Sequence, residues 1–207
     1  TECFVPPPEP APRSGLLYVG RLVEKKGVTV LLDALALLKN EGLVLPLTLI
    51  GDGPDRQALE RQAVDSGIDG QIDFLGAVKN QDLPPYYQQA AIFTLPSIIS
   101  ADGDQEGLGL VSVEAMACGC TVVASDLPAV RDVVRNRDNG LLVEQQSAPA
   151  LAAALRELTE NTALREQLGA AGLASASRFD WQAVSESYAR IIAGLLQPDG
   201  EPALPTA

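Results

Sequence analysis

Histidine is absent from this 207-residue chain. Without histidine, the chain cannot form Ser-His-Asp or Cys-His nucleophile arrangements, and it cannot form the His-Glu-x-x-His zinc site. Any chemistry must therefore use carboxylates, lysine, arginine and main-chain groups, or borrow residues from elsewhere.

Cysteine is scarce, with three residues at Cys3, Cys118 and Cys120. An odd number at this spacing does not make a disulfide framework, and no histidine or second cysteine pair completes a zinc site. We expect buried free thiols in a reducing compartment, which predicts a cytoplasmic protein. The sequence has no signal peptide and no apolar run near the ~20 residues that span a bilayer. The start at Thr1 indicates an excised or processed chain.

Basic and aromatic residues are also few. The formal net charge is -12 and no basic run occurs, which argues against nucleic acid and anionic membrane surfaces as main partners. Aromatic residues make up 4% of the chain and hydrophobic residues 46%, so the core must consist mainly of Leu, Val, Ile and Ala. The length suits one substantial domain or two small ones.

Short apolar strands alternate with helical patterns along the chain. We expect strands at 15–20, 45–51, 71–76, 91–97, 121–125 and 140–143. We expect helices at 27–42, 54–67, 82–90, 148–158, 162–176 and 180–195, one more within 106–120, and a short helical piece near 129–135. This alternation predicts the α/β class: a Rossmann-like parallel sheet of about six strands with helices on both faces and a helical C-terminal extension.

Charged residues and glycines gather where the expected strands end. Ligands bind at the carboxyl ends of the strands in such sheets. Gly20, Arg21, Lys25 and Lys26 follow the first strand, although the whole chain has only 15 Lys and Arg residues. Cations at a helix start oppose the helix dipole, so the cluster is either a solvated helix start or part of a phosphate site.

Two other strand-end motifs are weaker. "GDGPDR" (51–56) begins like a dinucleotide fingerprint but has Arg56 in place of the third glycine, so we expect a tight turn. "DGDQE" (102–106) offers three hard oxygen ligands, yet no calcium-loop spacing follows. We therefore favour an exposed acidic loop over a metal site.

The segment between Glu106 and Glu114 is the most informative. Gly107 and Gly109 let the backbone approach a ligand and leave free N–H groups at a helix start, which attract phosphate. Glu114 lies further into an apolar helix, where a carboxylate needs a salt bridge, a cap or the hydroxyl groups of a ribose. Two acids on either side of a phosphate cradle indicate a nucleotide-sugar ligand.

At this point the chain resembles a known family. The motifs are "PSIISADGDQEGLGLVSVEAMACGCTVVAS", with its E-x7-E spacing, and "YVGRLVEKKG", "LIGDGP", "IDFLGAV" and "NGLLV". Their order over residues 15–195 resembles the C-terminal, donor-binding half of a retaining glycosyltransferase of the GT-B fold, glycosyltransferase family 4 (glycosyl transferases group 1).

The resemblance implies a role for each matching residue. Arg21 and Lys26 would hold the donor diphosphate and stabilise it as it leaves, and Glu106 would face the sugar, so these three are the implied catalytic residues. Glu114 would hold the ribose hydroxyls. The remaining implied donor contacts are Gly20, the cleft wall at Gly51, Asp52 and Gly53, the base contacts Ala77 and Val78, and the cradle of Gly107, Leu108, Gly109 and Leu110.

The resemblance also implies the reaction and its partners. A hexose would pass from a UDP- or GDP-sugar to a glycan, lipid or small-molecule acceptor with retained anomeric configuration, without metal or cofactor. The acceptor would bind a separate N-terminal domain, so the chain alone would turn over little. Peripheral membrane association of the full-length enzyme stays open. Two alternative functions also stay open: a nucleotide-sugar epimerase of the same fold and a non-catalytic nucleotide-sugar-binding module.

The implied domain boundaries follow the family. Residues 1–14, with five prolines, would be an interdomain linker remnant, 15–178 the nucleotide-sugar-binding domain, 179–196 a helix that crosses to the other domain, and 197–207 a flexible tail. The sequence departs from the family in a longer "IISADGDQ" loop and in Asp132, where many relatives carry Glu.

Overall fold

The computed structural model describes residues 3–9 and 11–195 and contains one six-stranded sheet. The strand order is β3-β2-β1-β4-β5-β6, and every pairing is parallel. The strands are β1 (Ser14–Val19), β2 (Leu47–Ile50), β3 (Ile72–Gly76), β4 (Ala90–Leu95), β5 (Thr121–Ser125) and β6 (Leu141–Val143). The predicted α/β class and the six-stranded parallel sheet are confirmed.

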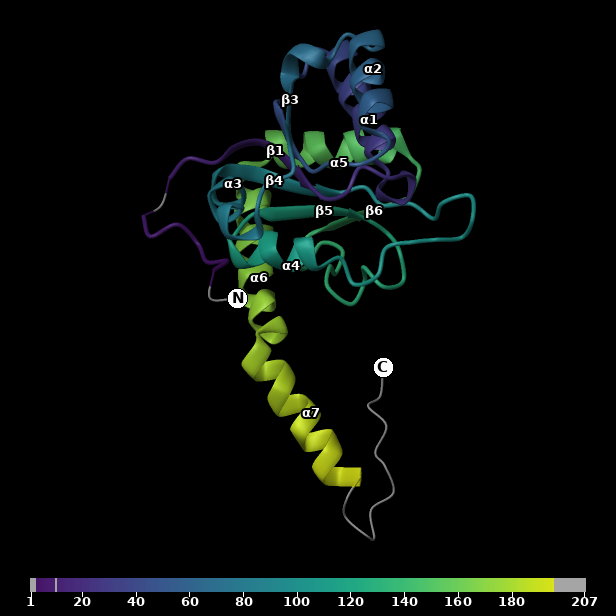
Figure 1. Cartoon of the computed structure of the whole chain (residues 1–207). Helices are drawn as coiled ribbons and strands as arrows, with labels where there is room; N and C mark the ends of the chain where they lie inside the picture. Colours follow the sequence, from purple (N-terminus) through teal and green to yellow (C-terminus); the bar gives the residue numbers. More distant parts are fainter. Residues whose placement is uncertain (1–2, 10, 196–207) are drawn as a thin grey trace.

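Helices cover both faces of the sheet (Figure 1). They are α1 (Val28–Asn40), α2 (Arg56–Asp65), α3 (Pro84–Gln89), α4 (Leu110–Ala117), α5 (Ala148–Glu160), α6 (Thr162–Ala176) and α7 (Trp181–Leu195). Four short 3-10 turns join them: η1 (Glu24–Lys26), η2 (Asp69–Gln71), η3 (Asn80–Asp82) and η4 (Ser177–Phe179).

The core consists of two apolar clusters, one on each face of the sheet. Strand β1 shows why, because Leu16 and Tyr18 belong to the cluster under α1, α2 and α5, whereas Leu17 and Val19 belong to the cluster under α3 and α4. Successive side chains of a strand point to opposite faces, so a strand covered on both sides is apolar throughout. This is the pattern from which the sheet was predicted.

The short helical piece predicted near 129–135 is wrong. The chain there forms hydrogen-bonded turns, with Val130 N donating to Leu127 O at 3.0 Å and Val133 N donating to Val130 O at 3.0 Å. The segment is rich in β-branched valine, which lowers helix propensity. The Asn139 side chain then accepts from Arg135 N at 2.6 Å and ends the turn.

The thiols only partly match the prediction. Cys118 and Cys120 are buried and free, and burial raises the pKa of each thiol to about 12. Cys3 is free but exposed, contrary to the expectation of buried thiols, because it lies on the N-terminal segment outside the core.

The two ends of the described chain differ in how they pack. Phe4 is buried against the α3 and α4 cluster, and Ser14 already belongs to β1. Helix α7 has no buried residue and extends away from the sheet in Figure 1. The predicted tail at 197–207 lies outside the described residues. Within the described part, no helix has the length and apolar character needed to cross a membrane.

Candidate donor-binding site

The sheet order places a switch point between β1 and β4, and we call the region beyond the carboxyl ends of these two strands the crevice. Strands β1 and β4 are neighbours, but β1 leads to α1 on one face and β4 leads to α4 on the other. In an open α/β sheet, ligands bind where the connections diverge in this way, beyond the carboxyl ends of the strands. Ile98 N donates to Lys25 O at 2.9 Å across this crevice, so the loops after β1 and β4 are in direct contact.

The loop after β2 packs directly against the loop after β1. A Cβ on Gly51 would lie 1.7 Å from Gly20 O, and one on Gly53 would lie 2.2 Å from Leu22 O, so both positions accept only glycine. Leu22 N also donates to Asp52 O at 2.9 Å. The turn predicted at 51–56 is therefore confirmed, and it packs against the loop after β1.

Lys26 and Glu106 form an ion pair at the centre of the crevice. Lys26 Nζ contacts Glu106 Oε2, and the side chains are only 15% and 11% exposed. Ser97 Oγ donates to the same oxygen at 3.3 Å. The structure thus unites two of the three predicted catalytic residues. The ion pair and the serine were not predicted.

Arg21 belongs to the same loop as Lys26 but takes no part in the ion pair. Its carbonyl oxygen accepts from the Tyr18 hydroxyl at 3.0 Å, which fixes the backbone at the end of β1. The residue is exposed, and its guanidinium has no hydrogen bond or ion pair within the part of the chain that the structure describes. Arg21 is therefore an exposed cation on the loop after β1, whereas Lys26 already has a carboxylate partner.

Helix α4 begins beside Glu106 with an uncapped first turn. Its N-cap is Gly109 in the left-handed region, at a φ of 69°, and this glycine supplies no side chain to accept from the first N–H groups. Uncapped N–H groups and the helix dipole attract an anion. A Cβ on Gly109 would lie 2.9 Å from Leu95 Cδ2, whereas one on Gly107 would meet nothing within 4 Å. The fold therefore requires glycine at position 109 but not at position 107.

Leu108 and Leu110 lie on either side of the N-cap Gly109. Leu108 is 38% exposed and Leu110 is 61% exposed, so the cradle predicted over Gly107–Leu110 faces outward. The exposure of these residues leaves the turn accessible to a ligand.

Glu114, on the first turns of α4, has a partner that the sequence did not reveal. Tyr87 OH donates to Glu114 Oε2 at 2.9 Å. Burial raises the pKa of the Glu114 carboxyl, and the Tyr87 hydrogen bond acts in the opposite direction. The residues predicted to meet the base differ in burial, since Ala77 is exposed while Val78 packs against the same core cluster as Tyr87.

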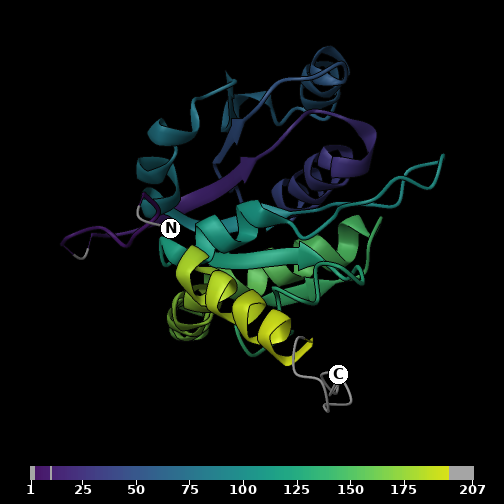
Figure 2. The same ribbon diagram turned by 60° about the horizontal axis from the view of Figure 1, so that its bottom comes forward.

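Each acid of the loop at 102–106 has a partner within the protein. Asp102 accepts from Ser100 Oγ at 2.6 Å, which lowers its pKa, and Asp104 pairs with Lys25 at 3.0 Å. Glu106 is held by Lys26. In the described residues, no group of three or more metal-ligating side chains converges. The loop projects from the body in both Figure 1 and Figure 2.

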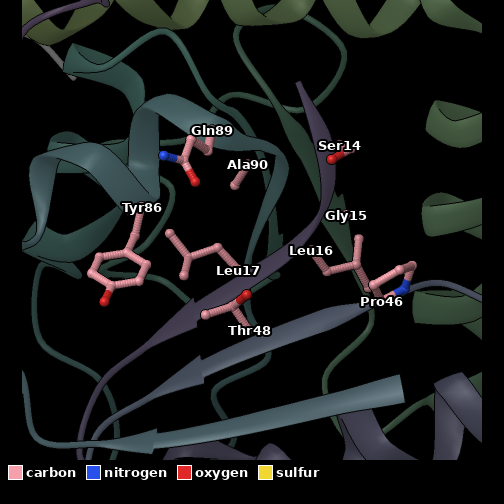
Figure 3. Close-up of a pocket in the computed structure, with 9 residues that line it drawn as sticks. All are labelled: Ser14, Gly15, Leu16, Leu17, Pro46, Thr48, Tyr86, Gln89 and Ala90. Carbon is pink, nitrogen blue, oxygen red and sulfur yellow. The ribbon is translucent and has the colours of Figure 1, made fainter. Parts of the chain in front are cut away.

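A separate small cavity lies at the opposite edge of the sheet (Figure 3). It has a volume of about 170 Å³ and is lined by the starts of β1 and β4, by β2 and its preceding Pro46, and by Tyr86 and Gln89 of α3. The cavity lies near the amino ends of these strands, whereas the candidate site lies beyond their carboxyl ends, so the two are separate.

Comparison with known proteins identifies relatives of this architecture. The family model for "Glycosyl transferases group 1" matches residues 5–174. The phosphatidyl-myo-inositol mannosyltransferase of Mycobacterium leprae is 39% identical over 183 residues, which cover 87% of this chain and 47% of that protein. The chain spans 36% to 47% of the length of the first curated relatives that it matches.

Solved structures share the fold. The C-terminal domain of a glycosyl transferase group 1 family protein (LpcC) from Francisella tularensis has a TM-score of 0.72 and 26% identity, covering 85% of this chain and 95% of that one. Anabaena HepE, solved in complex with UDP-glucose, has a TM-score of 0.76 and 25% identity, covering 87% of this chain and 49% of that one.

Proposed function

Because the chain belongs to the glycosyl transferases group 1 family, we propose that it is the half of a glycosyltransferase that binds the nucleoside-diphosphate sugar donor. One observation carries this proposal. The Lys26–Glu106 pair joins the loops that follow the neighbouring strands β1 and β4, beside the uncapped start of α4. A cation, an uncapped helix start and a carboxylate at one point form a site for a diphosphate with a sugar attached.

Each part of the donor has a place in this proposal. The diphosphate binds Lys26, Arg21 and the N–H groups at the start of α4. The sugar lies against Glu106, and the ribose hydroxyls donate to Glu114. The base lies near Ala77 and Val78, and Gly51–Gly53 closes the side of the crevice.

The proposed chemistry follows from the charges at the crevice. As the bond between the sugar and the diphosphate breaks, negative charge grows on the leaving phosphate and positive charge on the sugar carbon. Lys26, Arg21 and the α4 N–H groups stabilise the negative charge on the phosphate without a metal ion. Glu106 lies on the side of the positive charge on the sugar carbon. Transfer proceeds through an oxocarbenium-like transition state with retained configuration.

The donor is a UDP- or GDP-hexose in this proposal. The relatives support this class, since one is named a mannosyltransferase and another was solved with UDP-glucose. The acceptor binds a further domain of the full-length protein, so the 207-residue chain binds donor but transfers little sugar.

Calorimetric titration of the chain with UDP, GDP and their sugars tests the proposal. We expect one site, and we expect Lys26→Gln and Arg21→Gln each to weaken binding by about 10- to 100-fold, because each removes a charged hydrogen bond to phosphate. Lys39→Gln is the matched control, since Lys39 is exposed on α1 and bonds only to Gly67 O within the described residues. Equal affinities for all three variants and the unchanged chain would contradict the proposed site.

A further inference from the structure

Tyr87 is a completely buried residue of α3 whose hydroxyl reaches α4. Its exposed fraction is 0%, and its OH donates to Glu114 Oε2 at 2.9 Å. A buried tyrosine hydroxyl needs a hydrogen-bond partner, and a carboxylate is a strong one. Burial, with Glu114 adding to it, raises the pKa of Tyr87, so its hydroxyl keeps its proton and acts as a donor.

The Tyr87 ring and backbone are both fixed by their surroundings. The ring packs edge-on against Phe4, with centroids 5.7 Å apart, and at a tilt against Phe93, with centroids 5.6 Å apart. Arg13 Nη1 donates to Tyr87 O at 3.1 Å. A side chain held in this way offers its hydroxyl at one point in space, so whatever it bonds is also held there.

Glu114 keeps one carboxylate oxygen free of this contact. Oε1 takes part in no hydrogen bond within the described residues, and the side chain is only partly buried. Val111, one turn earlier on α4, and Val78, after β3, pack at the margin of the same core cluster. In the proposed donor site, Oε1 is therefore the Glu114 oxygen that remains to accept from the ribose.

We propose that Tyr87 is a positioning residue for Glu114: its hydroxyl holds one carboxylate oxygen so that the other accepts from the ribose hydroxyls of the donor. The inference rests on the proposed function. Its physical basis is preorganisation, because a carboxylate already held in its bound orientation loses less rotational freedom when the nucleotide binds.

The hydrogen bond also affects the charge of Glu114. Since the Tyr87 hydroxyl opposes the rise in the Glu114 pKa caused by burial, its removal raises that pKa further. The other titratable groups near this point are Arg13, which bonds to the C-terminal carbonyl of α4, and the Cys118 and Cys120 thiols. A Tyr87→Phe substitution leaves all three in place.

The test compares a nucleoside diphosphate with its 2′,3′-dideoxy analogue. Titration of the unchanged chain with UDP and GDP first identifies the tighter nucleotide. Tyr87→Phe, which keeps the ring, should weaken binding of that nucleotide by about 3- to 10-fold, the size of one hydrogen bond, and leave binding of the dideoxy analogue within about 2-fold. Tyr86→Phe is the matched control, because the neighbouring Tyr86 lines the cavity at the opposite edge.

A pH series separates positioning from a purely structural role. The advantage of the ribonucleotide over its dideoxy analogue depends on the ionised Glu114, so it is present above the Glu114 pKa and is lost as the pH falls through it. In Tyr87→Phe the midpoint of this loss should move to higher pH. The midpoint in Tyr86→Phe should not move.

The outcomes separate the two proposals. Equal weakening of both nucleotides by Tyr87→Phe, or no weakening of either, would overturn the positioning role while donor binding stands. No binding of UDP or GDP by the unchanged chain would refute the proposed function and this inference with it.

Discussion

Replacing Glu106 by glutamine tests the Lys26–Glu106 pair most sharply. The change removes one negative charge and leaves Lys26, only 15% exposed, without its anion. The attraction within such a pair is about 4 kcal/mol at a separation of about 4 Å and an effective dielectric constant of about 20. Breaking a fully buried pair costs about 3–5 kcal/mol. Because this pair keeps some contact with water, we expect unfolding to become easier by about 2–3 kcal/mol.

Urea and thermal unfolding measure this change. For a chain of this size, each kcal/mol shifts the melting temperature by about 2–4 °C, so Glu106→Gln should melt about 4 to 12 °C lower. Glu157→Gln is the matched control, because Glu157 pairs with Arg137 at 2.9 Å but the side chains are 36% and 61% exposed. An exposed pair contributes less than about 1 kcal/mol.

The same variant also reports on ligand binding. A bound diphosphate would replace the missing carboxylate beside Lys26, and it would no longer meet the negative charge of Glu106. UDP or GDP should therefore bind Glu106→Gln about tenfold more tightly than the unchanged chain, a difference of about 1.4 kcal/mol. The melting temperature of the variant should accordingly rise more at saturating nucleotide. Weaker nucleotide binding, or a loss of stability no larger than that of Glu157→Gln, would refute the reasoning.

Three further predictions concern single residues. Gly109→Ala should lower the free energy of unfolding by about 1–3 kcal/mol in urea titrations, because of its φ of 69° and the Leu95 contact at 2.9 Å; Gly103→Ala, with a φ of 84° and open space, should cost less. Since burial raises the folded-state pKa of Glu114, the carboxyl favours folding below about pH 4.5 and loses that contribution as the pH rises through its folded value, so Glu114→Gln should gain stability relative to the unchanged chain from pH 4 to 7. A thiol reagent should modify Cys3 in the native protein and the two buried cysteines only after unfolding; three equally fast thiols would contradict the described burial.

Much of the fold was predictable because both faces of the sheet are covered. Strands such as 15–20 and 91–97 are mostly apolar, and each is followed by a helical pattern, so their number and parallel arrangement could be inferred. The prediction of a helical piece near 129–135 failed because the local helix propensity is weak and the Asn139 side chain provides another partner for the backbone.

The site was predictable in part. Lys26 and Glu106 were each singled out, but their contact joins residues 80 positions apart and depends on β1 lying beside β4, which hydrophobic periodicity does not reveal. Tyr87 was missed for a similar reason. In "PPYYQQ" two adjacent tyrosines look alike, and only the packing of α3 shows that Tyr87 is buried and reaches Glu114.

A crystal structure of the chain with bound UDP or GDP would test the central claim most directly. We predict that the diphosphate lies beyond the carboxyl ends of β1 and β4, within hydrogen-bond distance of Lys26 Nζ and of the first N–H groups of α4. A nucleotide bound elsewhere, such as in the cavity at the opposite edge of the sheet, with the Lys26–Glu106 pair untouched, would contradict it.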